Sequence, residues 1–253
     1  MQTSENVATN AEVNFGAISE AAEQFKNNAG TWVVAVLIVA VIGLVLYGIV
    51  NIFGLSSLRH SMVVPPTPGV PPVMPNPFAM MPLFIGVGLV GLVINALLGA
   101  GLFRMAIKQI RGEAISISDL FDFGDVAVQA IIASIVLGII IEIGLMLCIL
   151  PGLVLSGLFM FTFPLIVDKK MGAIEAISAS MNALKGQWLM ATVFAIVVGV
   201  IYMIGAMLCG IGALVTGPIA LLSITVLYRN FFIGSSTPPS SGQTFEPAIP
   251  PGS

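Results

Sequence analysis

Residues whose side chains can do chemistry are few in this sequence, and they are widely spaced. Glu142 is the one carboxylate inside an apolar stretch long enough to span a membrane, and burying an ionisable group at that depth is costly enough to make it a functional candidate. It could form a proton or cation site, or it could snorkel or hydrogen-bond to another helix. We favour the second, because a helical rise of about 1.5 Å per residue places Glu142 away from the middle of its span. Three uncharged polar residues could line a cavity with it: Asn95, Gln129 and Ser134.

The two cysteines, Cys148 and Cys209, follow similar apolar sequences. If they are neighbours in an oxidising compartment, they could form a disulfide. We favour the alternative that they pack as two separate thiols, which behave as small apolar side chains. The Cα separation decides between these alternatives, and spacing along the chain does not supply it.

Two further motifs do not predict a cofactor or a metal. The glycines of 86–91 have the spacing of a dinucleotide-binding loop, but they lie inside an apolar span, so close helix packing is the better interpretation. His60 and the nearby methionines would suit a soft metal, yet scattered methionines usually make apolar contacts. With one His and two Cys, the chain has no cluster of nucleophiles and bases. We therefore predict a protein that is not an enzyme and holds no cofactor or metal.

The composition excludes a soluble globule. Only 8% of the 253 residues are charged and 57% are hydrophobic, whereas soluble domains carry about 25% charged residues. The sequence therefore predicts an all-α polytopic membrane protein with lipid as its main solvent.

Apolar segments predict six membrane spans. The two longest are each about twice the length of one span and have turn-forming residues near the middle, at 150–152 and 209–212. Each is therefore predicted to be a helical hairpin, although the second arms, 153–167 and 213–228, are short enough to cross only partially. The four segments are 31–52, 83–103, 126–167 and 188–228.

Basic residues predict the orientation. Eight of the nine lysines and arginines lie on one side of the spans and only Arg59 lies on the other. Because Lys and Arg are retained in the cytoplasm, both termini are predicted to be cytoplasmic. The residues expected to anchor the spans at that interface, with the bases attracted to anionic headgroups, are Trp32, Trp188, Arg104, Lys108, Arg111, Lys169, Lys170 and Arg229.

Matching segments of the sequence predict an internal repeat. Residues 143–148 match residues 204–209 at an offset of 61, and Gly30-Thr-Trp32 aligns with Gly186-Gln-Trp188 at an offset of 156. These matches predict three hairpins, each preceded by an amphipathic surface helix. In the N-terminal segment, residues 1–30, Phe15, Ile18, Ala22 and Phe25 fall on one face of such a helix.

A resemblance to a known group rests on short motifs spread over residues 15–232. They are Ala17–Ala21, Phe25–Asn28, Arg104–Ala106, Arg111–Glu113, Ser118–Phe121, Leu150–Gly152, Val167–Asp168 and Tyr228–Arg229. Together they resemble a widespread group of poorly characterised bacterial polytopic membrane proteins, similar to the membrane domain attached to some glycerophosphodiester phosphodiesterases. The resemblance implies an all-helical membrane domain of unknown activity. No soluble phosphodiesterase domain is present, so its activity does not carry over, and the Pro-rich loop departs from the pattern of the group.

Two hypotheses for function follow. The first is a non-enzymatic scaffold, accessory subunit or lipid-organising element in the membrane domain 31–232, acting through its surface helices and the extracytoplasmic Pro-rich loop 54–82. Its partners would be membrane lipids, with a membrane protein complex or a homo-oligomer as further candidates, and no nucleic acid. The alternative is a small transporter or lipid-handling permease with a cavity between the hairpins. Residues 233–253 are expected to form a disordered cytoplasmic tail.

Overall fold

The computed structural model describes residues 12–62, 81–208 and 210–234. These residues form helices joined by short turns and contain no strand. Six segments are long and apolar enough to cross a membrane, which confirms the predicted all-α polytopic fold. They are Ala29–Ile49, Ile85–Ile110, Ala127–Leu147, Ile149–Lys169, Ala173–Met207 and Ala213–Phe232.

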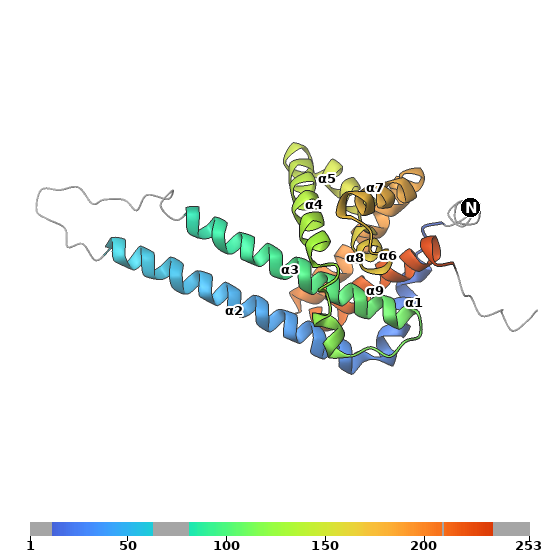
Figure 1. Ribbon diagram of the computed structural model, residues 1–253, viewed down its shortest axis with the longest axis horizontal. Coiled ribbons are helices and arrows are strands. Elements are labelled where there is room, and N and C mark those ends of the chain that lie inside the picture. Colours follow the sequence, from blue (N-terminus) through green and yellow to red (C-terminus); the bar gives the residue numbers. More distant parts are fainter. Residues whose placement is uncertain (1–11, 63–80, 209, 235–253) are drawn as a thin grey trace, which may run out of the picture.

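The first hairpin consists of α2 (Ala29–Met62) and α3 (Met81–Ile110), and it follows the short helix α1 (Gly16–Asn27). Figure 1 shows α2 and α3 projecting together away from the other helices. The apolar span ends at Ile49 but α2 continues to Met62, so the first residues of the predicted outer loop are helical. Residues 63–80, which hold most of the Pro-rich segment, lie outside the described part of the chain.

The second hairpin is formed by α4 (Ala127–Leu147) and by α5 (Ile149–Leu158), which α6 (Thr162–Lys169) continues. The predicted turn at 150–152 is misplaced, because the chain reverses at Cys148, where the backbone is extended, with φ −170° and ψ 147°. Pro151 instead lies in the first turn of α5, where a residue without an N–H breaks no helical hydrogen bond. A five-residue 3₁₀ helix, η3 (Ile117–Phe121), precedes this hairpin in place of a longer surface helix.

The third hairpin is formed by α8 (Trp188–Met207) and α9 (Ala213–Phe232), and α7 (Ala173–Leu184) with η4 (Lys185–Gln187) precedes it. The chain reverses between Met207 and Ala213, which agrees with the turn predicted at 209–212. Gly210 has a φ of +75° that favours glycine there. At about 1.5 Å per residue, the 20 residues of α9 reach about 30 Å, so the predicted short arm is long enough to cross.

Glycines allow the two arms of the second and third hairpins to approach closely. A Cβ on Gly144 of α4 would lie 3.1 Å from Cα of Gly152, and a Cβ on Gly205 of α8 would lie 1.9 Å from Oγ1 of Thr216. The two glycines are 61 positions apart, as are Thr216 and Leu155, which packs against Gly144. Each hairpin is therefore closed by a glycine at the same place.

Burial is concentrated at one end of the helices. We call this the charged end; it contains the C-terminal parts of α3, α6 and α9, the whole of α1, and η3. The largest buried side chains there include Tyr228, Phe161 and Met105. The buried face of α1 carries Ala17, Ala21 and Phe25, which corrects the predicted face, because Phe15 is exposed and Ile18 and Ala22 are only half-buried.

The opposite ends of the hairpins are mostly exposed, and we call residues 37–52, 85–90, 142–150 and 202–211 the apolar end. Within 142–150, only Gly144 is buried, and Gly205 is the only buried residue among those described in 202–211. Figure 1 shows α4 and α5 projecting in a different direction from α2 and α3. The hairpins therefore diverge as they leave the charged end.

Candidate functional site

Asp168 joins all three hairpins at the charged end. Its side chain is 3% exposed. The guanidinium of Arg111, just after α3, donates to one carboxylate oxygen, and the hydroxyl of Tyr228 in α9 donates to the other at 2.7 Å. Because Asp168 itself belongs to α6, this cluster connects one helix from each hairpin.

A second ion pair attaches the N-terminal helix to the last span. Arg229 of α9 donates through both terminal nitrogens to the carboxylate of Glu20 in α1, at 2.7 and 2.9 Å. Such a bidentate pair restricts orientation as well as distance. It helps to hold α1 against α9.

The loop before α4 is attached to α3 by two groups of carboxylates. Lys108 donates to Asp119 at 2.8 Å, and the backbone N–H of Ser116 donates to the same carboxylate. Burial tends to raise the pKa of Asp119, but these hydrogen bonds and the charge of Lys108 outweigh it and hold the pKa below its ordinary value. Arg104 binds the second group, Asp122 and Asp125.

Lys170 shares Asp125 with Arg104. Burial and the nearby guanidinium of Arg104 lower the pKa of Lys170, and Asp122 opposes that shift. Lys169 lies over the ring of Phe232 at 4.8 Å, a cation–π arrangement.

These contacts correct the predicted role of several bases. Attraction to anionic headgroups was expected to explain Arg104, Lys108 and Arg111, but each of them pairs with a carboxylate of the chain itself. Arg229 does the same with Glu20. Their main structural role is therefore to hold helices together.

Trp32 is also placed differently from the prediction. It is completely buried, and its indole N–H donates to Oε1 of Gln109 at 2.6 Å, while the Gln109 amide donates to the backbone of Gln24. The prediction of a headgroup anchor is wrong for this residue. Trp188 is 49% exposed, and for it the interfacial role stays a prediction.

The four polar candidates do not meet at one place. Asn95 and Ser134 line a common cavity of about 300 Å³ with Phe103 and Phe163. The side-chain amide of Asn95 also donates a hydrogen bond to the carbonyl of Gly91 in its own helix. The side-chain oxygen of Gln129 instead accepts from the N–H of Ala173, at the start of α7, at 2.8 Å. Glu142 is exposed on the side of α4.

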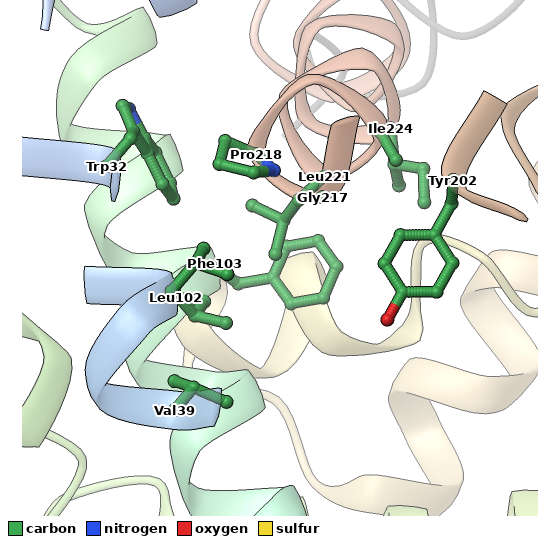
Figure 2. A pocket seen from close by; sticks show the side chains of 11 residues that line it. Trp32, Val39, Leu102, Phe103, Tyr202, Gly217, Pro218, Leu221 and Ile224 are labelled. Atoms are coloured by element: carbon green, nitrogen blue, oxygen red, sulfur yellow. The ribbon is translucent and has the colours of Figure 1, made fainter. Parts of the chain in front are cut away.

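An apolar cavity of about 320 Å³ lies between the first and third hairpins (Figure 2). Figure 2 shows the side chains of Trp32, Phe103 and Tyr202 gathered around this space, with Pro218 and Leu221 of α9 beside it. Sequence analysis missed this cavity, because its walls come from four helices and carry almost no polar side chain. The full lining is Trp32, Val36, Val39, Leu102, Phe103, Tyr202, Gly217, Pro218, Ala220, Leu221 and Ile224.

A third cavity, of about 360 Å³, lies between α5, α8 and α9 and shares Tyr202, Ala220 and Ile224 with the apolar cavity. Phe103 likewise lines both the apolar cavity and the one that holds Asn95. The three cavities are therefore neighbours among the described helices.

The cysteine and metal predictions are only partly addressed. Cys148 is a free, exposed cysteine, and Cys209 lies outside the described residues, so the proposed disulfide stays a prediction. In the described part of the chain, His, Cys, Asp and Glu form no group of three or more that could hold a metal ion. The side chains of His60 and of most of the methionines near it are outside that part.

No family model, no curated protein and no solved structure matches this chain. The resemblance to the bacterial polytopic group therefore stays an expectation. Asp168 and Tyr228, which belong to its short motifs, bond each other in the structure. Their presence in those motifs was the one sequence signal that could have indicated the contact.

Proposed function

We propose that the protein is a non-enzymatic scaffold or accessory subunit that binds a neighbouring membrane protein inside the bilayer. The observation that carries this proposal is a row of exposed side chains on α4 that includes Glu142. We call it the α4 stripe, and it consists of Val128, Ile132, Ile135, Ile139, Glu142 and Met146.

The spacing of the α4 stripe is that of a helix-packing surface. Its members alternate between four and three positions apart, which is the 3.5-residue period that keeps one face against a partner helix. Three of its members are isoleucines, whose restricted side chains lose little freedom on packing. A neighbouring helix fits this face.

Glu142 distinguishes this face from an ordinary lipid-facing one. Acyl chains supply no hydrogen-bond partner, so a carboxyl group on the outside of a span gains most from a polar group on a partner helix. A single polar residue in an apolar seam also selects the register of the two helices. Glu142 would therefore specify which helix binds and how it aligns.

The membrane and the orientation belong to the same proposal. We place the protein in the cytoplasmic membrane of a bacterium with both termini in the cytoplasm, supported by the eight bases on one side of the spans. The matching positions of Gly144 and Gly205 support the internal repeat. A reporter fused after Ser253 that is active only in the periplasm would contradict the orientation.

Affinity purification in a mild detergent tests the scaffold function. The wild-type chain is expected to copurify with a membrane protein in fixed proportion, either a second copy or a different chain. Glu142→Leu is expected to lose that partner, whereas Glu142→Gln, which keeps hydrogen-bonding groups, retains part of it. Met203→Leu is the matched control, because Met203 is exposed and is 61 positions from Glu142, at the corresponding place on α8. Retention of the partner by Glu142→Leu, or its absence from the wild type, would refute the proposal.

Lipid handling is the second candidate function, and the apolar cavity between the first and third hairpins favours it. A permease for a polar solute has less support, because such a pathway needs several polar groups around one route and the four candidates are distributed over separate places. The two functions predict different purified species: a protein partner for the scaffold, and a bound lipid for lipid handling.

A further inference from the structure

The walls of the apolar cavity all belong to membrane-spanning segments. Trp32, Val36 and Val39 lie within the span Ala29–Ile49, and Leu102 and Phe103 lie within Ile85–Ile110. The α8 and α9 residues, from Tyr202 to Ile224, belong to the last two spans. The cavity is partly open, and in a membrane the groups around these spans would be acyl chains rather than water.

The lining offers almost nothing for a polar ligand. The indole N–H of Trp32 is already donated to Gln109, and Pro218 has no backbone N–H. The only side-chain polar group left among the lining residues is the hydroxyl of Tyr202. A ligand held here would be recognised by its apolar chain, and apolar cavities of this kind exclude water.

The lining of the cavity fits an acyl chain, which has no polar group that needs a hydrogen-bond partner. A second cavity lies next to it and shares Tyr202, Ala220 and Ile224 with it.

We propose that this cavity binds one acyl chain of a membrane lipid, which lies between the first and third hairpins in contact with Phe103 and Tyr202 and beside the buried Trp32. The inference is independent of the scaffold function, because it requires only that the chain spans a membrane. The lining residues contact the acyl chain of the lipid and do not distinguish between headgroups.

The two tryptophans allow a direct test in bilayers. Bromine atoms on an acyl chain quench indole fluorescence at short range, so vesicles of phosphatidylcholine with a dibrominated chain report contact. In Trp188→Phe, the only indole left is Trp32, which is fully buried from solvent and lines the cavity. Its fluorescence is expected to be lost in brominated vesicles relative to unbrominated ones.

A variant that fills the cavity separates bound lipid from bulk lipid. A Cβ on Gly217 would make only an ordinary contact of 3.7 Å with the ring of Tyr202, so Gly217→Leu directs a side chain into the space. Made in Trp188→Phe, it is expected to restore the Trp32 fluorescence. Gly43→Leu is the matched control, since Gly43 is an exposed glycine of α2 with open space around it, and it is expected to leave the quenching unchanged.

The outcomes decide the proposal in either direction. It is overturned if Trp32 is not quenched, or if Gly217→Leu leaves the quenching as strong as before, because bulk lipid would then be the quencher. If Gly217→Leu does not fold, Ala220→Leu takes its place, because Ala220 lines both adjoining cavities. If this test fails, the expected copurification of a protein partner through the α4 stripe is unaffected. The scaffold proposal and the lipid proposal can therefore be refuted independently.

Discussion

At the charged end, side chains from different hairpins bond one another, whereas at the apolar end the second and third hairpins each pack against themselves. Asp168 receives hydrogen bonds from Arg111 and Tyr228, which lie on the other two hairpins. At the apolar end, the three atoms nearest to an added Cβ on Gly144, and likewise on Gly205, belong to the same hairpin as the glycine. Polar contacts thus join the hairpins at the charged end, and glycine contacts close two of them at the apolar end.

The difference has a physical reason. An ion pair between helices is favourable where water or headgroups can solvate whatever charge is left over, and that condition holds only near a membrane surface. Deeper in the bilayer, helices associate by close packing of small residues. Exposed faces such as the α4 stripe, to which we assign a partner helix, and the apolar cavity, to which we assign a lipid chain, lie on parts of the spans that polar contacts do not cover.

The largest expected effect is from Asp168→Ala, which removes the carboxylate shared by three hairpins. It leaves the buried hydroxyl of Tyr228 without an acceptor and should cost about 3 kcal/mol or more of unfolding free energy. Thermal unfolding in detergent, followed by circular dichroism, measures this loss. The control is Asp122→Ala, whose side chain is 63% exposed and which should cost less than about 1 kcal/mol. Equal losses in the two variants would mean that Asp168 does not join the hairpins.

Tyr228→Phe should weaken the same junction by less. Only the hydrogen bond to the Asp168 carboxylate is lost, and a bond to a charged group contributes about 1.5 to 3 kcal/mol. The ring remains packed in the core beside Phe161 and Phe232. In the same unfolding assay, combining Tyr228→Phe with Asp168→Ala should add little to Asp168→Ala alone, because both variants remove one interaction.

Gly205→Ala tests the apolar end in the same way. The added methyl would lie 1.9 Å from Oγ1 of Thr216 and 2.8 Å from its Cβ, so the arms of the third hairpin must separate, at a cost of about 1 to 3 kcal/mol. Gly199→Ala, in the same helix with open space around it, should be neutral or stabilising by up to about 1 kcal/mol. If both substitutions behave alike in thermal unfolding, close packing does not hold this hairpin.

The smallest expected effect is a loss of folding stability at low pH. The pKa of Asp119 is lowered in the folded chain, so its stabilising contribution is complete above the pKa of an unfolded Asp, about 3.9, and is lost as the pH falls through the lower folded value. Stability should therefore decrease as the pH drops below about 4. Asp119→Asn should be less stable at neutral pH and should lose less on acidification, which a pH series of unfolding temperatures measures.

Much of the fold could be predicted because span length and hydrophobicity are local properties of the sequence. The six spans and the turn at 209–212 follow from apolar runs and from glycine. The turn at 150–152 was misplaced because Pro151 and Gly152 fit a helix start as well as a loop. Whether a proline begins a helix or ends one depends on the residues that pack around it.

The interactions that place the helices relative to one another could not be predicted. Arg111 and Asp168 are 57 positions apart, and Trp32 and Gln109 are 77 apart. From the sequence, Arg111 and Trp32 were assigned to the membrane interface. Their true partners could not be recognised, because those partners are distant in the chain. For the apolar cavity no sequence signal exists, because its lining residues look like any others in a span.

The ion pair between Glu20 and Arg229 also bears on how the protein is assembled during synthesis. The two residues are 209 positions apart, so α1 leaves the ribosome long before the helix that it binds. Each hairpin can enter the membrane as it is made, and Arg111 can pair with Asp168 before the last span is complete. A nascent chain that stops before α9 would lack the hydrogen bond from Tyr228 to Asp168 and the partner of Glu20, so α1 would not yet be attached.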